Sequence, residues 1–254
     1  MRIAGIIPAR YGSTRFPGKP LADICGKPMI WWVYRNCSKF KGFSELILAI
    51  DDERVKAACD ELSLPYVMTS PNHDTPTARI AEVVEKVDAD LYIGIMGDEP
   101  LVEPDSFQGL IPIKETLDLY VAMLIKPLTE ATDVVDTTNQ KVVVNALGNI
   151  MLTSRSPIPF PKGSSNFAYY ATGSTFAYTR EALRYFNNSE RSQLELAEEN
   201  DLIRWLYQGV PVKAVYSSYK TVSVDSQKDL DRVRRIIAEK IEKEAEAKNE
   251  HSLA

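Results

Sequence analysis

The sequence predicts an α/β fold built on a mostly parallel sheet, with a smaller antiparallel portion in the second half of the chain. Two observations lead to this fold class. Over the first 130 residues, short apolar runs alternate with amphipathic stretches, which is the rhythm of a Rossmann-like sheet covered by helices. Beyond about residue 130, β-branched and aromatic runs broken by turn residues indicate antiparallel strands.

The first half contains five short apolar runs that we assign to strands, at residues 3–7, 46–50, 66–68, 91–96 and 121–125. Helices are predicted between them, at residues 28–39, 53–62 and 77–87. In the third of these, Ile80, Val83, Val84 and Val87 share one face, as expected for a helix that packs on a sheet. This order of strands and helices predicts that the strands run parallel.

The second half contains two strand-rich segments, "KVVVNALGNIMLTSRSPIPF" (141–160) and "FAYYATGSTFAYT" (167–179). A last helix is expected to begin near Ser226, and its apolar residues Leu230, Val233, Ile237 and Ile241 recur at helical spacing. The charged sequence after Ile241 is expected to fray into solvent. Since no long linker interrupts the chain, we predict a single domain over 1–254.

Composition excludes several classes of function. A net charge of -5 argues against nucleic acid as a partner, and no apolar run approaches the roughly 18 residues that cross a membrane. Three cysteines without metal-ligand spacing, and no signal segment, predict a cytoplasmic protein. The two histidines, His73 and His251, make a zinc site or a histidine-based triad improbable. His73 is either a loop residue or a ligand contact.

The segment "IIPARYGSTRFPGKPL" (6–21) follows the first strand and combines cations with glycines and hydroxyls. Arg10, Arg15 and Lys19 supply positive charge, and Gly12 and Ser13 allow main-chain N–H groups to approach an anion. The spacing fits neither a phosphate-binding P-loop nor a dinucleotide-binding fingerprint. We therefore predict a nucleoside triphosphate site at the carboxyl edge of the sheet. The alternative is a solvated turn.

Two carboxylates occupy similar positions after apolar runs, Asp98 in "LYIGIMGDEP" (91–100) and Asp225 in "TVSVDSQ" (221–227). Magnesium takes oxygen ligands, normally one or two carboxylates together with phosphates and water. Both aspartates are therefore candidates for a Mg²⁺ site near the phosphates, with Glu99 as a possible neighbour. The alternatives are a turn residue for Asp98 and a helix N-cap for Asp225.

The ordered set of motifs in this chain resembles the nucleotide-sugar cytidylyltransferases, and among them most closely the 3-deoxy-manno-octulosonate cytidylyltransferase (CMP-Kdo synthetase) family. The motifs are the loop at 6–21, "GKPMI", "YVMTSPNH", "MGDEPLV", "SRSPIPF", "FAYTR" and "SVDSQKDLDRV". The resemblance implies the nucleotide-diphospho-sugar transferase fold, transfer of CMP from CTP to a 3-deoxy-2-keto sugar acid with release of pyrophosphate, and a role in lipopolysaccharide biosynthesis. It also implies Mg²⁺ as cofactor and a homodimer, with the aromatic strand at 167–178 in the core or at the subunit interface.

The same resemblance implies roles for particular residues. Asp98 and Asp225 would hold the magnesium ion. The residues that bind CTP would be Arg10, Arg15 and Lys19 at the phosphates, Ala9, Gly12 and Ser13 in the same stretch, and Thr77 and Arg79 in the segment that faces the cytosine base. Residues 1–130 would form the nucleotide-binding half, residues 131–225 the acceptor-binding and dimer half, and residues 226–254 the C-terminal helix.

For the small anionic acceptor, the resemblance implies contacts from Arg155, Thr172 and Asp201. Arg155 suits a carboxylate, although a strand-end salt bridge is an alternative. Thr172 and Leu202 replace a histidine and an amide of the family pattern, and Pro76 stands where glycine is expected. The acceptor is accordingly Kdo or, alternatively, an amino-sugar keto acid or a small phosphonate. A non-catalytic nucleotide-binding protein is a third hypothesis.

Overall fold

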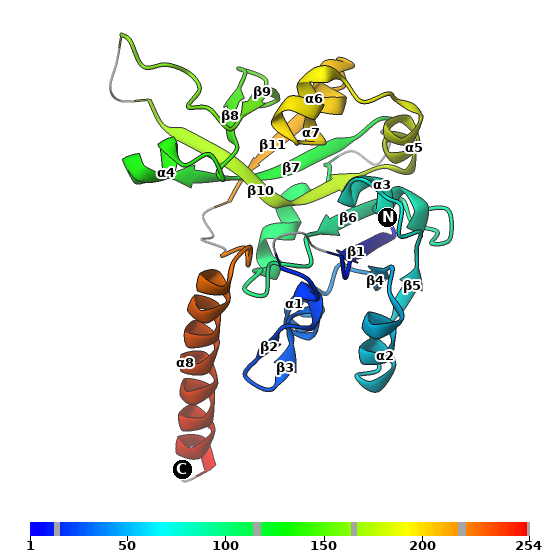
Figure 1. Ribbon diagram of the computed structural model, residues 1–254, viewed down its shortest axis with the longest axis vertical. Helices are drawn as coiled ribbons and strands as arrows, with labels where there is room; N and C mark the ends of the chain where they lie inside the picture. Colours follow the sequence, from blue (N-terminus) through cyan, green and yellow to red (C-terminus); the bar gives the residue numbers. More distant parts are fainter. Residues whose placement is uncertain (13–15, 114–117, 164–166, 218–221, 253–254) are drawn as a thin grey trace.

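The computed structural model describes residues 1–12, 16–113, 118–163, 167–217 and 222–252. The strands of the main sheet are β1 (Ile3–Ala9), β4 (Glu45–Ile50), β5 (Tyr66–Met68), β6 (Leu91–Ile95), β7 (Val121–Leu128), β8 (Lys141–Val144), β9 (Ile150–Ser154), β10 (Tyr169–Tyr178) and β11 (Val212–Tyr216). Seven of them follow the order β11-β7-β10-β6-β1-β4-β5, while β8 pairs with β10, and β9 pairs with β8 (Figure 1). A hairpin of β2 (Asp23–Ile24) and β3 (Lys27–Pro28) stands apart.

The parallel part of the sheet is formed by β6, β1, β4 and β5, as the sequence predicts. Every residue of β1 is buried, because helices cover both faces of this part. Its side chains alternate between two core clusters, with Ala4 and Ile6 on one face and Ile3 and Ile7 on the other. The α/β fold class with a mixed, largely parallel sheet is confirmed.

Strand β10 is antiparallel to its neighbours and joins the two halves of the chain. Its last residues pair with β6 and its first residues pair with β8, while β7 pairs with it on its other edge along the whole length of the strand. A bulge between Thr172 and Phe176 separates these two stretches. Gly173 lies in the bulge, where a Cβ atom would come within 2.6 Å of the Leu124 carbonyl oxygen, so only glycine fits this approach.

Helices form a layer on each face of the sheet. The helices that pack on one face are α3 (Pro76–Val83), α5 (Arg180–Asn188) and α7 (Leu202–Tyr207), and those on the other are α1 (Met29–Cys37), α2 (Glu53–Glu61) and the 3-10 helix η2 (Pro104–Leu110). The remaining helices are α4 (Ala131–Val135), α6 (Gln193–Glu198), α8 (Gln227–Ser252) and the 3-10 helix η1 (Lys19–Leu21). Among the described helices, none has both the length and the apolar composition needed to cross a bilayer.

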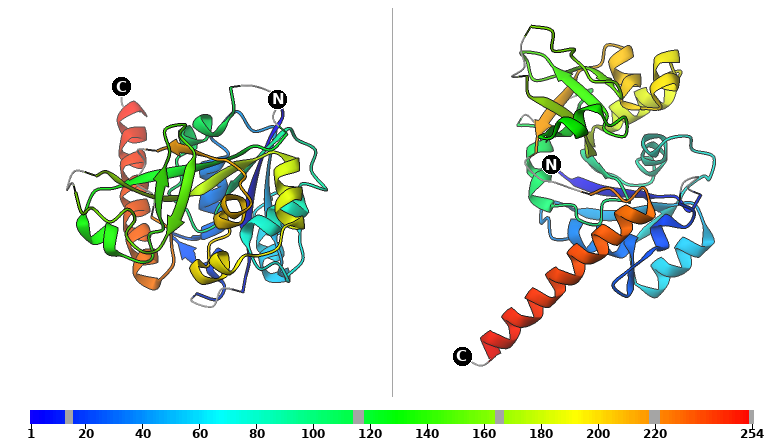
Figure 2. Two further views of the ribbon diagram at one scale, coloured as in Figure 1. Left: turned by 90° about the horizontal axis from the view of Figure 1, so that it is seen from above. Right: turned by 60° about the vertical axis from the view of Figure 1, so that its left-hand side comes forward.

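Helix α8 differs from the expectation that the chain frays after Ile241. The helix continues to Ser252 and projects away from the rest of the molecule (Figures 1 and 2). Its first turns are anchored because Leu230, Val233 and Ile237 are buried against Trp32. The later sequence is rich in Glu, Lys and Ala, which favour helix even without tertiary contacts, and this accounts for the extra turns.

The carboxyl ends of β1 and β6 come close together where the candidate site residues begin. Gly97, two residues after β6, lies against β1, and a Cβ atom there would stand 2.5 Å from the Pro8 carbonyl oxygen. Asp98 therefore follows directly after a point at which two backbones touch. This close approach fixes the position of Asp98 relative to the loop that follows β1.

Candidate functional site

The loop after β1 is tied to the neighbouring strand by a carboxylate. The Tyr11 N–H donates to Asp51 Oδ1 (3.0 Å), and Asp51 directly follows β4. Gly18 closes the loop, since its N–H donates to the Tyr11 carbonyl oxygen (3.0 Å) and its backbone is left-handed (φ 72°). Arg10 and Gly12 are exposed within this loop, while Ala9 is buried. Ser13 and Arg15 lie outside the described residues.

Lys19 brings together the two aspartates that the sequence nominates for metal binding. Its Nζ lies 2.7 Å from Asp98 Oδ2 and 3.2 Å from Asp225 Oδ1, and it also donates to the Val224 carbonyl oxygen (2.8 Å). The Lys19 side chain is 14% exposed, against 29% for Asp98 and 40% for Asp225. Two carboxylates from distant parts of the chain thus share one cation at the carboxyl edge of the sheet.

This pair of carboxylates fits the ligand set that magnesium uses when it also binds phosphates. The described residues contain no group of three or more His, Cys, Asp or Glu side chains that could enclose a metal ion. Magnesium does not need one, because one or two carboxylates, substrate phosphates and water complete its octahedron. Asp98 and Asp225 are therefore a suitable partial set of ligands for a metal that arrives with a nucleotide.

Glu99, named from the sequence only as a possible neighbour, is a buried acid beside this site. It is 1% exposed, and its Oε1 accepts a short hydrogen bond from the Ser223 hydroxyl. Burial raises the pKa of Glu99, and the negative charge of Asp98 raises it further, while the hydrogen bond from Ser223, the nearby Ser174 hydroxyl and the charge of Lys126 oppose the shift.

Arg79 is buried in α3 and forms an ion pair with Asp51. Its Nη2 lies 2.8 Å from Asp51 Oδ2, and its Nη1 donates to Thr69 Oγ1 (2.5 Å). Burial lowers the pKa of Arg79, an effect that the nearby negative charge of Asp51 opposes. The guanidinium therefore links α3, β4 and the loop after β1. Sequence analysis missed Asp51, although it follows an apolar strand just as Asp98 does.

Thr77 and Asp201, assigned to different ligands from the sequence, lie next to each other. Thr77 is buried in the first turn of α3, where Pro76 takes the first helical position and its missing N–H costs nothing. Burial raises the pKa of Asp201, and hydrogen bonding from Thr77 opposes that shift. His73, close by in the chain, contacts Glu82 Oε2 through Nε2 (2.6 Å), as expected of a loop histidine with a satisfied ring.

Arg155 is half-buried at the end of β9 and is held from several sides. Its Nε donates to the Glu198 carbonyl oxygen (2.9 Å) and its Nη1 to the Thr137 carbonyl oxygen (3.1 Å). The buried Lys141 donates through Nζ to the Arg155 carbonyl oxygen. Thr172 lies on β10, and its N–H and hydroxyl both donate to Gln140 (2.8 and 3.3 Å).

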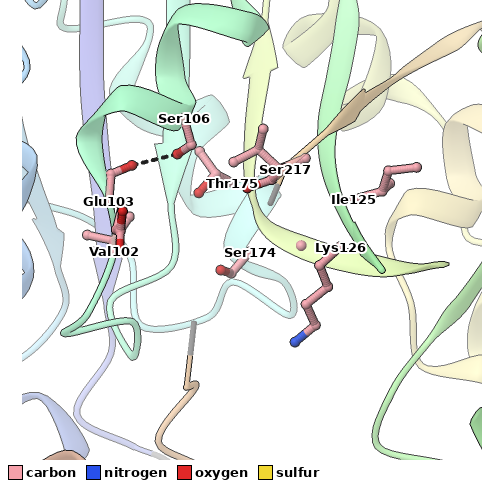
Figure 3. Close-up of a pocket in the computed structure, with 10 residues that line it drawn as sticks. Val102, Glu103, Ser106, Ile125, Lys126, Ser174, Thr175 and Ser217 are labelled. Atoms are coloured by element: carbon pink, nitrogen blue, oxygen red, sulfur yellow. Dashed lines mark hydrogen bonds between the residues drawn. The ribbon is translucent and has the colours of Figure 1, made fainter. Parts of the chain in front are cut away.

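A small cleft opens beside the bulge in β10, between β7 and η2 (Figure 3). Lys126 and the hydroxyl residues Ser106, Ser174 and Thr175 are among the residues that line it. Ser106 Oγ donates to the Glu103 carbonyl oxygen (2.6 Å), which closes the first turn of η2. The cleft combines the side chains of Lys126 and Glu103 with several hydroxyls, and its volume of about 20 Å³ has room for little more than a water molecule.

The cysteines are not placed for catalysis. Cys37 and Cys59 are buried in the core under the sheet, and Cys25 is exposed in the turn between β2 and β3. All three are free thiols. Burial raises the pKa of Cys59 to about 11, so it does not supply a thiolate near neutral pH.

Comparison with known proteins agrees with the family expected from the sequence. Residues 4–230 match the model of a family described as cytidylyltransferase. The 3-deoxy-manno-octulosonate cytidylyltransferase of Lawsonia intracellularis is 36% identical over 242 residues, which cover 94% of this chain and 95% of that protein. The enzyme of the same name from Escherichia coli is 35% identical over 241 residues, covering 94% and 98%.

Solved structures give the same result for the fold. A CMP:2-keto-3-deoxy-manno-octonic acid synthetase in complex with CTP is similar with a TM-score of 0.89 and 35% identity, covering 94% of this chain and 100% of that chain. A 4-diphosphocytidyl-2C-methyl-D-erythritol synthase from Anaerococcus prevotii has a TM-score of 0.61 at 13% identity, covering 93% and 98%. This second likeness concerns the fold alone.

Proposed function

We propose, on the premise that this chain belongs to the cytidylyltransferase family, that it transfers CMP from CTP to a 3-deoxy-2-keto sugar acid, Kdo or a close analogue. The product would be the CMP derivative of the acid, with pyrophosphate released. The family relationship and the similar structure with CTP bound support the nucleotide. We place the reaction in the cytoplasm and in lipopolysaccharide biosynthesis, where an activated Kdo is used.

The reaction is an in-line displacement at the α-phosphorus of CTP. A hydroxyl oxygen of the acceptor forms a bond to this phosphorus, its proton passes to water, and the bond to the bridging α–β oxygen breaks as pyrophosphate leaves with the electron pair. No protein nucleophile is needed, so catalysis depends on positioning and on neutralising charge. The free thiols, which lie in the core or on the surface, are consistent with such a mechanism.

The cations and acids described above would share this task. Lys19, and Arg10 at the end of β1, would face the triphosphate and balance the charge that develops on the leaving pyrophosphate. Arg15 has the same proposed role and lies outside the described residues. Asp98 and Asp225 would hold Mg²⁺, which when bound supplies further neutralisation at the phosphates.

One observation carries the proposal most strongly. The carboxylates of Asp98 and Asp225, from opposite ends of the sequence, both contact the ammonium of Lys19 at the carboxyl edge of the parallel strands. Ligand sites of open α/β sheets lie at this edge. A protein that only bound other macromolecules would have no need to gather two acids around the ammonium of Lys19 there.

A different acceptor remains the second candidate. Leu202 is fully buried in the core with Trp205, so it offers a sugar no hydrogen-bonding group. The Thr172 hydroxyl is directed to Gln140, and Arg155 keeps its Nη2 without a hydrogen-bond partner among the described residues. These features favour an acid that needs a carboxylate contact but fewer hydroxyl contacts than Kdo, such as an amino-sugar keto acid or a small phosphonate.

We also propose a homodimer. The hairpin of β8 and β9 and the segments next to it carry exposed apolar side chains, with Leu147 at 75%, Met151 at 59% and Phe160 at 83% exposed. An apolar surface of this kind is typical of an interface between subunits. Light scattering at micromolar concentration should give twice the mass of the chain, and a monomer would contradict the proposal.

The decisive experiment is a pyrophosphate-release screen. Four nucleoside triphosphates are each combined with Mg²⁺ and a panel containing Kdo, an amino analogue of Kdo, sialic acid and small phosphonates. We expect release only with CTP and with one or two of the keto acids. Release with a purine nucleotide in preference to CTP, or no release with any acid while CTP still binds in calorimetry, would refute the proposed function.

A further inference from the structure

Helix α8 anchors Asp225 on one side, since the Asp225 N–H donates to Asp229 Oδ2 (3.2 Å), while the support on its N-terminal side comes from another part of the chain. Residues 222–225 form neither helix nor strand, and they lie more than 120 positions after Asp98 in the chain. A carboxylate on such a segment needs an external support if it is to face Asp98 across a single cation. The contacts of Ser223 and Val224 show where that support comes from.

Ser223 and Val224, which directly precede Asp225, form hydrogen bonds with Glu99 and Asp98, the residues that follow β6. The Val224 N–H donates to the Asp98 carbonyl oxygen (2.9 Å), and the Ser223 hydroxyl donates to Glu99 Oε1. The Val224 side chain is fully buried beside Trp32. The segment is thus fixed at Ser223 and Val224, the two residues that precede Asp225.

Glu99 is the residue that holds Ser223 through its side chain, and its own backbone is fixed by two hydrogen bonds. Its N–H donates to the Met96 carbonyl oxygen (3.3 Å), and its carbonyl oxygen accepts from the Val102 N–H (3.0 Å). Its second carboxylate oxygen, Oε2, is buried and has no hydrogen-bond partner within the part of the chain that the structure describes. Since burying a carboxyl oxygen without a partner is costly, a smaller or apolar side chain would suit the fold alone better.

We propose that Glu99 is a positioning residue of the metal site: its carboxyl group holds Ser223 and thereby sets Asp225 opposite Asp98. The proposal rests on the proposed function, in which these two aspartates bind Mg²⁺. Glu99 itself is not a metal ligand in this scheme, because its Oε1 is occupied by Ser223 and its side chain is buried. Partners of this kind commonly change metal affinity by about 10- to 100-fold when they are removed.

The test uses Glu99→Met, which removes both carboxyl oxygens, Glu99→Gln, which keeps an oxygen to accept from Ser223, and Ser223→Ala. Glu103→Gln is the matched control, since Glu103 lies four residues further along the chain, before η2, and is exposed. Mn²⁺ binding to each variant is titrated by electron paramagnetic resonance with a non-hydrolysable CTP analogue present. Hydrogen exchange of the Val224 amide is measured on the protein without ligands.

We expect Glu99→Met and Ser223→Ala to bind Mn²⁺ about tenfold more weakly or worse, and to exchange the Val224 amide faster, while Glu99→Gln stays within about threefold of the wild type. Glu103→Gln should match the wild type. Wild-type Mn²⁺ affinity in a folded Glu99→Met or Ser223→Ala protein overturns the proposal, and if Glu99→Met does not fold, Ser223→Ala decides. Unchanged exchange at Val224 overturns it as well.

These outcomes are separate from those that test the proposed function. If no acceptor releases pyrophosphate, the proposed function fails, but the exchange rate of the Val224 amide still reports whether Glu99 holds the segment. If Asp225→Asn binds Mn²⁺ as tightly as the wild type, the metal assignment fails, and the positioning role of Glu99 fails with it.

Discussion

Replacing Lys19 by methionine should affect metal binding and turnover in opposite directions. The Lys19 ammonium stands 2.7 Å from Asp98 and 3.2 Å from Asp225, which is the place that a shared divalent ion would take. In the protein without nucleotide, an incoming metal ion must displace this ammonium from both carboxylates. Methionine keeps the length of the side chain and removes the competing charge.

The size of the effect follows from the exposure of the two pairs. Ion pairs with solvent-exposed partners contribute about 0.2–1 kcal/mol each, and Asp98 and Asp225 are 29% and 40% exposed. Losing the competitor at both pairs should therefore favour the metal by about 0.4–2 kcal/mol, or about 2- to 30-fold in affinity. Without Lys19, the two carboxylate oxygens, at most about 6 Å apart, also lose the ammonium that both contact, which favours the divalent ion further.

Turnover should fall in the same variant. Lys19 is proposed to pair with the triphosphate once the metal has taken the carboxylates, and loss of one such preorganised group typically costs about 100- to 1,000-fold in kcat. The assay is a Mn²⁺ titration without nucleotide, followed by pyrophosphate release with CTP and the best acceptor.

Lys27→Met is the matched control for Lys19→Met, because it removes an exposed positive charge outside the site. Lys27→Met should leave both Mn²⁺ affinity and turnover unchanged. The reasoning is refuted if Lys19→Met binds Mn²⁺ no more tightly than the wild type.

Three further predictions concern other residues. Asp98→Ala and Asp225→Ala should each reduce pyrophosphate release by at least about 100-fold while thermal unfolding shows a folded protein; retained turnover in either would mean that the metal assignment is wrong. Arg79→Met leaves the carboxylate of Asp51, whose side chain is 9% exposed, without its ion pair. The free energy of unfolding in urea should therefore fall by about 3–5 kcal/mol. A decrease below about 1 kcal/mol would contradict the structural role of Arg79. Burial raises the pKa of Glu82, but hydrogen bonds from Lys86, Ser70 and His73 outweigh this effect and lower the pKa to about 2, from an ordinary value of 4.5. Its stabilising contribution, up to about 3 kcal/mol, is present above pH 4.5 and lost as the pH falls towards 2, so Glu82→Gln should flatten the fall in stability between pH 5 and 3, and an unchanged slope would exclude this role.

The parallel core was predictable because its signal is local. The apolar runs at residues 46–50 and 91–96 are bounded by polar residues, and both become buried strands within one residue of the predicted limits. Helix α3 begins one residue before the predicted start, because Thr75 accepts a hydrogen bond from the Ala78 N–H as its N-cap. Strand β7 continues to Leu128, beyond the predicted end at residue 125, because it pairs with β10 along this whole length.

The supporting residues of the site were not predictable in this way. The local pattern indicates Asp98 and Asp225 separately, each after an apolar run, and only the resemblance to a family assigns both to one metal ion. The contact between Ser223 and Glu99 spans 124 residues, and the one between Arg79 and Asp51 spans 28. Such pairs depend on the way in which strands are ordered in the sheet, which local periodicity does not specify.

Strand β10 connects the neighbours of Arg155 with those of Asp98, because Ala171 pairs with Lys141, which donates to the Arg155 carbonyl oxygen, and Ser174 accepts from the Met96 N–H, with the bulge at Gly173 between them. A nucleotide and an acceptor held as we propose would accordingly meet across a gap whose width is set by backbone hydrogen bonding rather than by mobile side chains. Evolution of a new acceptor preference could then proceed by exchanging residues on one side of the bulge, while the geometry of the phosphate chemistry on the other side stays the same.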